Sequence, residues 1–412
     1  VLGDTAEYVW QKEQLGTGDA VKKVCAELTG FDGDLLVLYG DTPFINAASL
    51  QTLVDVHRAH RAAATVLTAE LADPTGYGRI VRSAEGLLTG IVEERDADLE
   101  EKRIREVNTG IYCFSVQELQ AALTRLTPKN AQGEYYLTDV IAELYKAGKP
   151  LQTVKSDHPE EIMGPNDRKA LAQTEALMRK RILDRLMEAG VTIIDPAMTY
   201  VDPRVQIGKD STLYPGSILL GETKIGTNCQ IGPFTQITTS VIGDNSRVSF
   251  STLNNALLGR EVEVGPYSYL RPGTQAADHA KIGGFVEIKN SSVGLASKVP
   301  HLSYIGDTTI GAEVNIGAGS ITCNYDGTRK WPTIIGDGAF IGSNTNLVAP
   351  VTVGGQAVVG AGSTIPRDVP AQSVTVARAR QTSKVMPPSF QVKAWEKADI
   401  YLIEVTCPTA EA

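Results

Sequence analysis

The sequence is poor in cysteine, and the cysteines it has show no paired spacing. Five occur in 412 residues, far apart, at Cys25, Cys113, Cys229, Cys323 and Cys407. Scattered single cysteines disfavour a disulfide framework and a cysteine-rich zinc site. They indicate reduced thiols in a cytoplasmic protein.

The sequence also lacks long apolar runs and an excess of basic residues. No apolar stretch approaches the roughly 18 residues that a membrane-spanning helix needs. A formal net charge of -9 disfavours nucleic acid as a partner. Neither a GxGxxG motif nor a P-loop lysine motif is present. Because 412 residues are too many for one ordinary core, we expect two domains.

The strongest pattern that is present is an aliphatic residue at every sixth position. Two unbroken runs show it: Ile207, Leu213, Leu219, Ile225, Ile231, Ile237, and later Ile335, Ile341, Leu347, Val353, Val359, Ile365. A period of six fits neither a helix nor a lone strand, but it fits short strands stacked into a parallel β-helix. Glycine often follows the aliphatic residue, as at Gly226, Gly232, Gly317 and Gly342, where we expect it to allow a tight corner.

The largest interruption of this period lies between Ile316 and Ile335 and carries CNYDGTRK at residues 323–330. Asn, Asp and Gly favour turns, so the segment predicts a loop that leaves the coil. Loops on a rigid scaffold are frequent places for functional residues.

Residues before the hexads read as an α/β unit. An apolar strand at 34–39 runs into Gly40-Asp41, a helical pattern covers 48–61, and a second strand follows at 64–68. Buried strands followed by helices predict a mostly parallel sheet covered on both faces, with ligands beyond the carboxyl ends of its strands. We therefore expect an α/β unit at 1–167, a connecting helix at 168–190, a β-helix at 191–382 and a tail at 383–412.

A cluster of polar residues lies in the repeat region between Arg271 and Lys330, and the core of a β-helix does not require polar residues there. If about three hexads close one coil, residues about 18 apart lie above one another, so Arg271 and Lys289 should stack. With Lys330 on the predicted loop they would suit a phosphate. His301 is more often structural than catalytic as a lone histidine, but Glu287 could orient it as a general base.

Eight motifs, spread over most of the chain, match one family. They are EQLGTG (13–18), LYGD (38–41), DPTGYGRI (73–80), NTGI (108–111), NAQGEYYLTD (130–139), LRPG (270–273), HLSYIGD (301–307) and NIGAGSITCNYDG (315–327). From Trp10 to about Thr382 the chain resembles the bacterial bifunctional N-acetylglucosamine-1-phosphate uridyltransferase/glucosamine-1-phosphate acetyltransferase family. The resemblance implies a nucleotidyltransferase-type, Rossmann-like α/β domain followed by a left-handed β-helix of hexapeptide repeats.

For the β-helix, the resemblance implies acetyl transfer from acetyl-CoA to glucosamine-1-phosphate in a homotrimer, with His301 as the base. It implies that the sugar phosphate is held by Arg271, Lys289, Tyr304, Asn315, Asn324 and Lys330. It assigns acetyl-CoA contacts to Ala318, Tyr325, Ser343, Ala361 and Arg378, with a main-chain N–H near Ala318 facing the oxyanion.

For the α/β unit, the resemblance implies uridylyl transfer from UTP, giving UDP-N-acetylglucosamine for peptidoglycan and lipopolysaccharide precursors. Asp41 and Asn166 match the Mg²⁺ ligands. The nucleotide and amino-sugar positions are Gln11, Gly16, Thr17, Tyr39, Gly40, Asp41, Gly76, Glu93, Asn108 and Asn166.

The family opens with a strand, a Gly-rich loop that cradles the triphosphate, and a lysine, roughly sixty residues that would precede Val1. We therefore expect this sequence to be a fragment of a longer chain, with an N-terminally incomplete first unit. We also expect these 412 residues alone to make almost no UDP-N-acetylglucosamine from UTP, because the main phosphate clamp is missing.

Three other functions compete with this one. The first is a sugar-phosphate nucleotidyltransferase whose β-helix serves only for assembly; consumption of acetyl-CoA would separate the two. A trimeric β-helix carbonic anhydrase needs three histidine ligands to zinc, whereas the repeats hold only His279 and His301. A purely structural solenoid would show a flat repeated Thr or Ser face without the Arg, Lys and His cluster.

Overall fold

The computed structural model describes residues 6–158, 161, 164–165 and 167–383, together with the strands β37 (Val392–Lys397) and β38 (Ile400–Val405). The chain divides into two compact units, Val1–Arg179 and Lys180–Ala412, and the division lies within helix α5 (Arg168–Glu188). In the described ranges, no helix is both long and apolar enough to cross a membrane.

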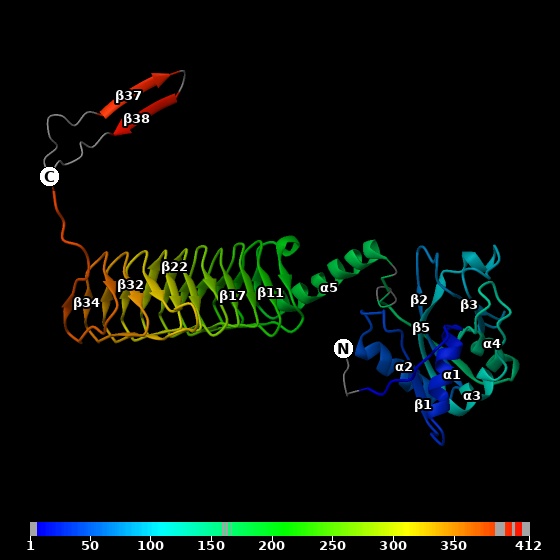
Figure 1. Cartoon of the computed structure of the whole chain (residues 1–412). Helices are drawn as coiled ribbons and strands as arrows, with labels where there is room; N and C mark the ends of the chain where they lie inside the picture. Colours follow the sequence, from blue (N-terminus) through cyan, green and yellow to red (C-terminus); the bar gives the residue numbers. More distant parts are fainter. Residues whose placement is uncertain are drawn as a thin grey trace. The chain divides into compact units, whose positions relative to one another are not determined.

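The first unit combines a sheet with short helices (Figure 1). Its strands are β1 (Asp34–Val37), β2 (Ala64–Glu70), β3 (Arg79–Arg82), β4 (Leu88–Val92), β5 (Glu106–Ser115) and β6 (Leu151–Lys155). Its helices are α1 (Thr17–Glu27), α2 (Ala47–Ala59), α3 (Val116–Leu123), α4 (Asp139–Lys146) and the 3₁₀ turn η2 (Glu101–Arg103).

The sheet is mixed, with the order β4-β3-β5-β2-β6, and β1 pairs with β5. Within this sheet, the β2–β6 pair is the one parallel pair among the described strands, so the prediction of a mostly parallel sheet is wrong. The reason is that β3 and β4 form a hairpin and β5 runs antiparallel to three neighbours, without the crossover helix that a parallel pair needs.

Helices cover both faces of this sheet, as the apolar runs predict. Val66 and Tyr112 lie in one core cluster with residues of α1, α3 and α4. Leu67 and Cys113 lie in a second cluster with Leu53 of α2. Because successive strand residues point to opposite faces, the nearly continuous burial along β2 and β5 means that both faces of the sheet are covered.

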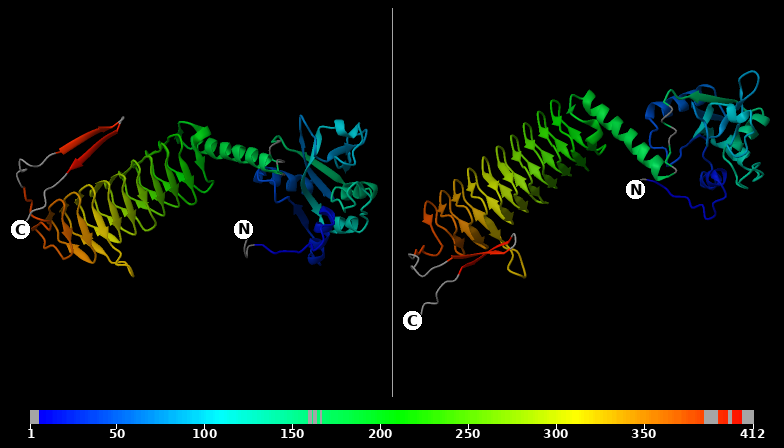
Figure 2. Two further views of the ribbon diagram at one scale, coloured as in Figure 1. Left: turned by 45° about the horizontal axis from the view of Figure 1, so that its top comes forward. Right: turned by 90° about the horizontal axis from the view of Figure 1, so that it is seen from above.

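The second unit is a β-helix of about ten coils, and its strands stack into three parallel sheets (Figures 1 and 2). Face 1 contains β7 (Thr192–Ile193), β10 (Thr212–Leu213), β13 (Gln230–Ile231), β16 (Arg247–Val248), β19 (Glu263–Val264), β22 (Lys281–Gly284), β25 (Lys298–His301), β28 (Asn315–Ile316), β31 (Phe340–Ile341), β34 (Val358–Val359) and β36 (Val374–Thr375). Face 2 contains β8 (Tyr200–Val201), β11 (Ile218–Leu220), β14 (Gln236–Thr238), β17 (Thr252–Asn254), β20 (Tyr269–Leu270), β23 (Glu287–Lys289), β26 (Tyr304–Gly306), β29 (Ile321–Cys323), β32 (Asn346–Val348) and β35 (Thr364–Ile365). Face 3 contains β9 (Gln206–Ile207), β12 (Lys224–Ile225), β15 (Val241–Ile242), β18 (Leu257–Leu258), β21 (Gln275–Ala276), β24 (Ser292–Val293), β27 (Thr308–Ile310), β30 (Thr333–Ile335) and β33 (Val351–Val353). A 3₁₀ turn, η4 (Pro196–Met198), precedes β8.

The hexad residues form the core of this unit, as predicted. All twelve except the half-buried Ile207 are buried, and the fold class of both units is confirmed. Phase slips shorten a coil from 18 to 17 residues: Leu213 pairs with Ile231, whereas Ile225 pairs with Ile242.

Glycine after the hexad residue has a different role from the one predicted. Gly232 does have a positive φ of 101°, but Gly226, Gly317 and Gly342 do not. A Cβ on Gly317 would lie 2.4 Å from the Ser343 nitrogen, and one on Gly342 would lie 2.5 Å from the Ala361 nitrogen. The glycines are therefore needed because the next coil approaches so closely.

Candidate functional site

The basic cluster, which consists of Arg271, Lys289 and Lys330, lies on the outer side of face 2 and on the loop that follows it. Leu270, Ile288 and Ile305 point into the core in three successive coils, so their neighbours along the chain point outward. Glu287 pairs with Tyr304 across the sheet, and Arg271 donates its backbone N–H to the Ile288 carbonyl. Arg271 and Lys289 therefore stack in adjacent coils, as the spacing of 18 predicts.

This cluster holds more positive than negative charge. The Lys330 ammonium lies beside Lys289 and, with Arg271 nearby, lowers the pKa of Lys289. Arg271 donates a 2.9 Å hydrogen bond to Glu287, and Asp307 is the second carboxylate nearby. The three cations exceed the two carboxylates, so one positive charge is unbalanced. An anion bound between Lys289 and Lys330 would reduce the repulsion between the two ammonium groups.

A second set of polar groups lies at the corner between faces 2 and 3. Asp307 accepts hydrogen bonds of 2.6 Å from the side-chain amides of both Asn290 and Asn324. A Cβ on Gly306 would lie 2.5 Å from the Tyr304 hydroxyl and 2.6 Å from the Asn324 amide nitrogen. The absence of a side chain there brings the Tyr304 and Asn324 polar groups together.

The loop that carries Lys330 leaves the coil between β29 and β30, as predicted, and internal contacts fix its shape. Residues Tyr325 and Lys330 form a β-bridge across it. Asp326 accepts hydrogen bonds from the backbone N–H groups of Thr328 and Arg329, both 2.8 Å, and from the Trp331 indole at 2.6 Å. These donors hold the pKa of Asp326 well below its ordinary value.

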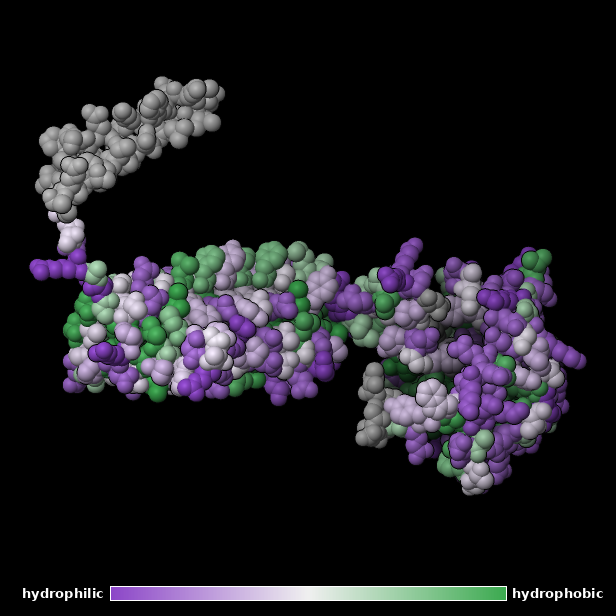
Figure 3. All heavy atoms as spheres, viewed as in Figure 1, coloured by the Kyte–Doolittle hydropathy of each residue, from purple (hydrophilic) through white to green (hydrophobic). Residues whose placement is uncertain are grey.

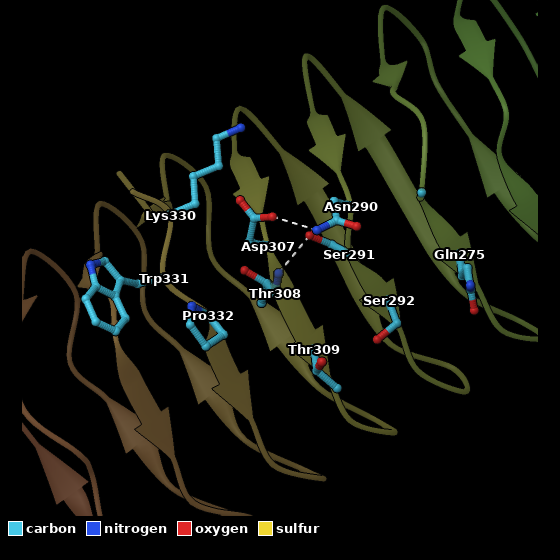
Figure 4. Close-up of a pocket in the computed structure, with 11 residues that line it drawn as sticks. Gln275, Asn290, Ser291, Ser292, Asp307, Thr308, Thr309, Lys330, Trp331 and Pro332 are labelled. Carbon is cyan, nitrogen blue, oxygen red and sulfur yellow. Dashed lines mark hydrogen bonds between the residues drawn. The ribbon is translucent and has the colours of Figure 1, made fainter. Parts of the chain in front are cut away.

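A hollow of about 510 Å³ adjoins this corner (Figure 4). In the figure, Asn290 reaches Asp307, and the Thr308 backbone N–H reaches the Ser291 hydroxyl at 2.9 Å. Lys330 also lines the hollow, so the basic cluster and the hollow share one corner.

His301 ends β25 on face 1 and is exposed. Glu287 binds Arg271, and no described residue forms a hydrogen bond with the His301 imidazole. The interpretation that Glu287 orients His301 is therefore wrong here: Glu287 belongs to face 2, and its carboxylate is engaged by a guanidinium. Asn315 is on face 1 and pairs with Lys298, three residues before His301.

A column of unpaired backbone N–H groups follows His301 at the corner between faces 1 and 2. The same corner position is occupied in successive coils by His301, Ala318, Ser343 and Ala361, each of which precedes a residue with positive φ. The coils are joined at this corner by backbone hydrogen bonds, such as the one from the Asn344 N–H to the Ala318 carbonyl at 2.7 Å. Within the described chain, the N–H groups of Ala318, Ser343 and Ala361 donate no hydrogen bond.

Some earlier coils have no N–H group at this position. The residue equivalent to Ala318 is the one whose carbonyl accepts from the N–H of the next coil. In two earlier coils it is Pro233, which accepts from Phe250, and Pro266, which accepts from Phe285, and proline has no N–H. The column ends at Arg378, whose guanidinium donates to the Ala361 carbonyl at 2.6 Å. Unpaired N–H groups along an edge are suited to an extended ligand that carries amide carbonyls.

Four of the five predicted acetyl-CoA residues thus lie at one corner. Tyr325 does not lie in this column: it is on the loop after face 2, 61% exposed, and its hydroxyl donates to the Gly327 carbonyl at 2.6 Å.

In the first unit, the predicted residues converge around Tyr39. Its ring packs where a Cβ on Gly110 would be, at 2.3 Å. Burial, and next the charge of Glu93, raise the pKa of Tyr39, and its hydroxyl contacts Thr17 and Tyr112. The Asn108 amide donates to the Tyr112 hydroxyl at 2.6 Å.

Glu93 lies beside this group. Its carboxylate accepts from the Thr138 hydroxyl at 3.0 Å, and burial raises its pKa. A Cβ on Gly78 would lie 3.4 Å from the Glu93 carboxylate and 3.6 Å from the Asn108 Cβ. The Gly-rich turn at 76–78 therefore borders the same site, and the Gly76 N–H itself donates to Glu94 at 3.2 Å.

Gln11 and Gly16 form a turn at the start of α1. The Gln11 amide donates to the Gly16 carbonyl at 3.1 Å and to Asp19 at 2.9 Å. Gly16 has a φ of 107°. The Leu137 N–H donates to the Thr17 hydroxyl at 3.1 Å, which ties this turn to the segment before α4.

Gly40 and Asp41 are exposed after β1, and Asn166 lies outside the described residues. The described part contains no group of three or more His, Cys, Asp or Glu side chains that could hold a metal ion. One exposed carboxylate at Asp41 still suits Mg²⁺, which proteins usually bind through one or two carboxylates, with substrate phosphates and water completing the shell.

Comparison with known families agrees with both units. Residues 2–159 match the nucleotidyl transferase family, and residues 204–239 and 332–367 match the bacterial transferase hexapeptide repeats. The bifunctional protein GlmU of Carboxydothermus hydrogenoformans is 52% identical over 384 residues, which are 93% of this chain and 86% of that protein. Those of Halalkalibacterium halodurans and Heliobacterium modesticaldum are each 51% identical over 383 residues, 93% of this chain and 84% of each relative.

The chain belongs to the GlmU family. It is therefore a transferase with a nucleotidyltransferase unit and a hexapeptide-repeat unit.

Several residues of this GlmU-family chain that complete the two sites were missed at the sequence level. Asp307 was visible only as the last letter of HLSYIGD, and its contacts come from residues 17 positions away on either side. Tyr112 lies four residues after Asn108, hence on the same side of β5, which strand alternation alone could have indicated. Thr138 belongs to the NAQGEYYLTD motif, but nothing in the motif indicates its hydrogen bond to Glu93, 45 positions away.

Proposed function

We propose that this protein acts in the two-step formation of UDP-N-acetylglucosamine. The β-helix transfers an acetyl group from acetyl-CoA to glucosamine-1-phosphate. The α/β unit provides part of the site at which the product is joined to UTP with release of pyrophosphate, a step that we expect these 412 residues to perform hardly at all by themselves. The observation that carries the first step is the column of unpaired N–H groups at Ala318, Ser343 and Ala361, which follows His301 at one edge of face 2, the face that carries the basic cluster.

In the proposed acceptor site, Arg271, Lys289 and Lys330 bind the phosphate. A dianion between Lys289 and Lys330 would remove the repulsion that lowers the pKa of Lys289. Tyr304 and Asn324 bind the sugar, and Asn315 lies near the amine. This division places the charged end of the acceptor on face 2 and its amine toward face 1.

The proposed acetyl transfer needs only protein groups and acetyl-CoA. His301 takes a proton from the acceptor amine, and the nitrogen lone pair attacks the thioester carbonyl. The tetrahedral oxyanion accepts a hydrogen bond from the Ala318 N–H, which has no other described partner. Collapse of the intermediate breaks the C–S bond and releases CoA as thiolate, which takes up a proton.

The rest of acetyl-CoA follows the column away from His301. The Ser343 and Ala361 N–H groups meet the amide carbonyls of its pantetheine arm, Arg378 meets its phosphates, and Tyr325 contacts it from the loop. An extended chain with regularly spaced carbonyls matches donors that recur once per coil.

The proposed uridylyl site uses the residues around Tyr39. Gln11, Gly16 and Thr17 hold the uracil, Tyr39 and Gly40 line the site, and Gly76, Glu93 and Asn108 hold the amino sugar. Asp41, with Asn166, would hold Mg²⁺, which would neutralise charge on the phosphates. Glu93 and Asn108 offer an acceptor and a donor in a partly buried setting, which suits discrimination among sugar hydroxyl and acetamido groups.

The proposed assembly is a homotrimer built on the β-helix. Phe234, Phe250, Tyr267 and Phe285 form a ladder with ring centroids 5.2 to 5.9 Å apart. Leu302, 65% exposed, continues it next to His301. Apolar surface runs along one long edge of the β-helix in Figure 3. A neighbouring copy that covers the ladder would also close the open side of the His301 site.

Release of CoA in the presence of glucosamine-1-phosphate tests this proposal against the alternative of a non-catalytic β-helix. Acceptor-dependent CoA release by the unmodified protein is expected. Its absence, with intact β-helix structure by circular dichroism, would favour the assembly role. Sedimentation at micromolar protein should give three chains per particle, and an active monomer would contradict the trimer.

A further inference from the structure

Glu161 is a fully buried carboxylate, 0% exposed, that the two proposed reactions leave unused. Its Oε1 accepts hydrogen bonds from the Asn46 side-chain amide and from the Ser49 hydroxyl, the latter at 2.9 Å. Its Oε2 accepts from the Ser156 hydroxyl at 2.9 Å. Burying a charge costs several kcal/mol, so the three donors must offset a substantial penalty.

These donors place Glu161 at the start of helix α2. Asn46 is the N-cap of α2, and its Oδ1 accepts from the Ser49 N–H at 2.8 Å. A carboxylate there also interacts favourably with the positive end of the helix dipole. The Glu161 carboxylate is therefore bonded to the first turn of α2, which packs against the sheet.

Ser156 supplies a second anchor on the sheet itself. It directly follows β6, and its N–H donates to the Thr68 carbonyl of β2 at 2.8 Å. Glu161 thus joins the end of β6 to the N-terminus of α2 with one side chain.

Asp41 lies in the loop that ends at the first of these anchors, Asn46. The segment from β1 to α2, residues 38–46, has no regular secondary structure and ends at Asn46. Three residues after Glu161, Gly164 lies against Asp41: a Cβ on Gly164 would be 3.1 Å from the Asp41 carbonyl oxygen and 3.6 Å from its carboxylate. Glu161 is therefore hydrogen-bonded to the end of the Asp41 loop, and Gly164, three positions later in the sequence, lies against Asp41.

We propose that Glu161 is a positioning residue that holds Asp41 in the orientation needed to bind a divalent cation. The proposal rests on the proposed uridylyl site, because it needs Asp41 as a cation ligand. In this proposal Glu161 acts through Asn46 and Ser49, at the end of the Asp41 loop, and is not itself a cation ligand.

The test compares Glu161→Gln with a matched control, Glu106→Gln, in the whole protein. Glu106 is also a hydrogen-bonded carboxylate of the same sheet. It accepts from Thr68 at 2.9 Å and from Arg82, and none of its described hydrogen bonds reaches residues 38–46. Amide hydrogen exchange over residues 38–46, without substrate, should quicken about tenfold in Glu161→Gln and stay unchanged in Glu106→Gln. Mn²⁺ affinity with UTP present, followed by paramagnetic resonance, should fall about tenfold, the usual size for loss of a supporting residue.

Unchanged exchange at 38–46 in folded Glu161→Gln would overturn the proposal, and so would unchanged Mn²⁺ affinity. If the unmodified protein binds no Mn²⁺ with UTP, the proposed uridylyl site fails, while the exchange result still decides whether Glu161 fixes the loop. If Glu161→Gln does not fold, Ser49→Ala removes one donor and should produce a smaller change of the same kind at the same amides.

Discussion

The two units bring residues together over different distances along the chain. In the β-helix, groups that form hydrogen bonds come from adjacent coils. The Asp244 carboxylate accepts from the Thr227 backbone N–H, 17 residues away, and the Asp278 carboxylate accepts from the Arg260 N–H, 18 residues away. The Asp337 carboxylate accepts from the Ala312 N–H, 25 residues away, because the loop is inserted between them. In the α/β unit, Thr17 meets Leu137 across 120 residues and Glu93 meets Thr138 across 45.

This difference determines what can be inferred before the structure is known. In a solenoid, contact follows from counting, because each coil can touch only its neighbours. Arg271 and Lys289 could therefore be placed together from their spacing. In the mixed sheet, contact depends on strand order, which apolar runs do not encode, and the predicted parallel pairing was wrong.

The sharpest test of the comparison is substitution of His301, which the solenoid places at the start of the open N–H column. His301→Ala should slow acetyl transfer by about 100-fold or more, as expected for loss of a general base. His279→Ala is the matched control, since it changes an exposed histidine of the same β-helix that pairs with Glu261. Rates of CoA release give the answer, and near-normal release by His301→Ala would remove it from the mechanism.

A smaller effect is expected from crowding between coils. A Cβ on Gly294 would lie 2.2 Å from the Gly311 carbonyl oxygen, so Gly294→Ala should destabilise the β-helix by about 1–3 kcal/mol. Gly40→Ala is the control in the α/β unit, because nothing lies within 4 Å of a Cβ there. Thermal unfolding of the two variants and the unmodified protein measures the effect. An unfolding midpoint of Gly294→Ala equal to that of the unmodified protein would show that the coils can accommodate the added methyl group without losing stability.

Loss of one phosphate-binding cation should have a somewhat smaller consequence. Lys330→Met should raise the KM for glucosamine-1-phosphate about tenfold, the size of one charged hydrogen bond, and should raise the pKa of Lys289 by removing the adjacent ammonium. Lys224→Met, in an early coil on face 3, is the control. An unchanged KM would place the phosphate elsewhere.

The smallest effect concerns the α/β unit and depends on pH. Because burial raises the pKa of Glu93, the folded state binds its proton more tightly than the unfolded state, and this contribution to stability is lost as the pH rises through the folded pKa. Glu93→Gln should therefore stabilise the unit at pH 7. The gain should vanish below about pH 4, near the ordinary pKa of Glu.

Unfolding midpoints between pH 4 and pH 8 measure this effect, with the exposed Glu100→Gln as the control. A gain that does not depend on pH would show that the charge on Glu93 is not penalised in the folded protein.

The sequence by itself determined the β-helix, its hexad core, the stacking of Arg271 on Lys289 and the loop at 323–330. It could do so because a six-residue period and nearest-neighbour stacking leave one arrangement. The resemblance to a family named the remaining site residues, but it did not show how they meet.

The tertiary structure alone decided the rest. It paired Glu287 with Arg271 and not with His301, because Glu287 lies on face 2 whereas His301 lies on face 1. It left the Ala318, Ser343 and Ala361 N–H groups open, a property of backbone geometry that no side-chain pattern reports. It also brought Glu161 to Asn46 across 115 residues. Such contacts depend on how distant segments pack, and local sequence carries no record of that packing.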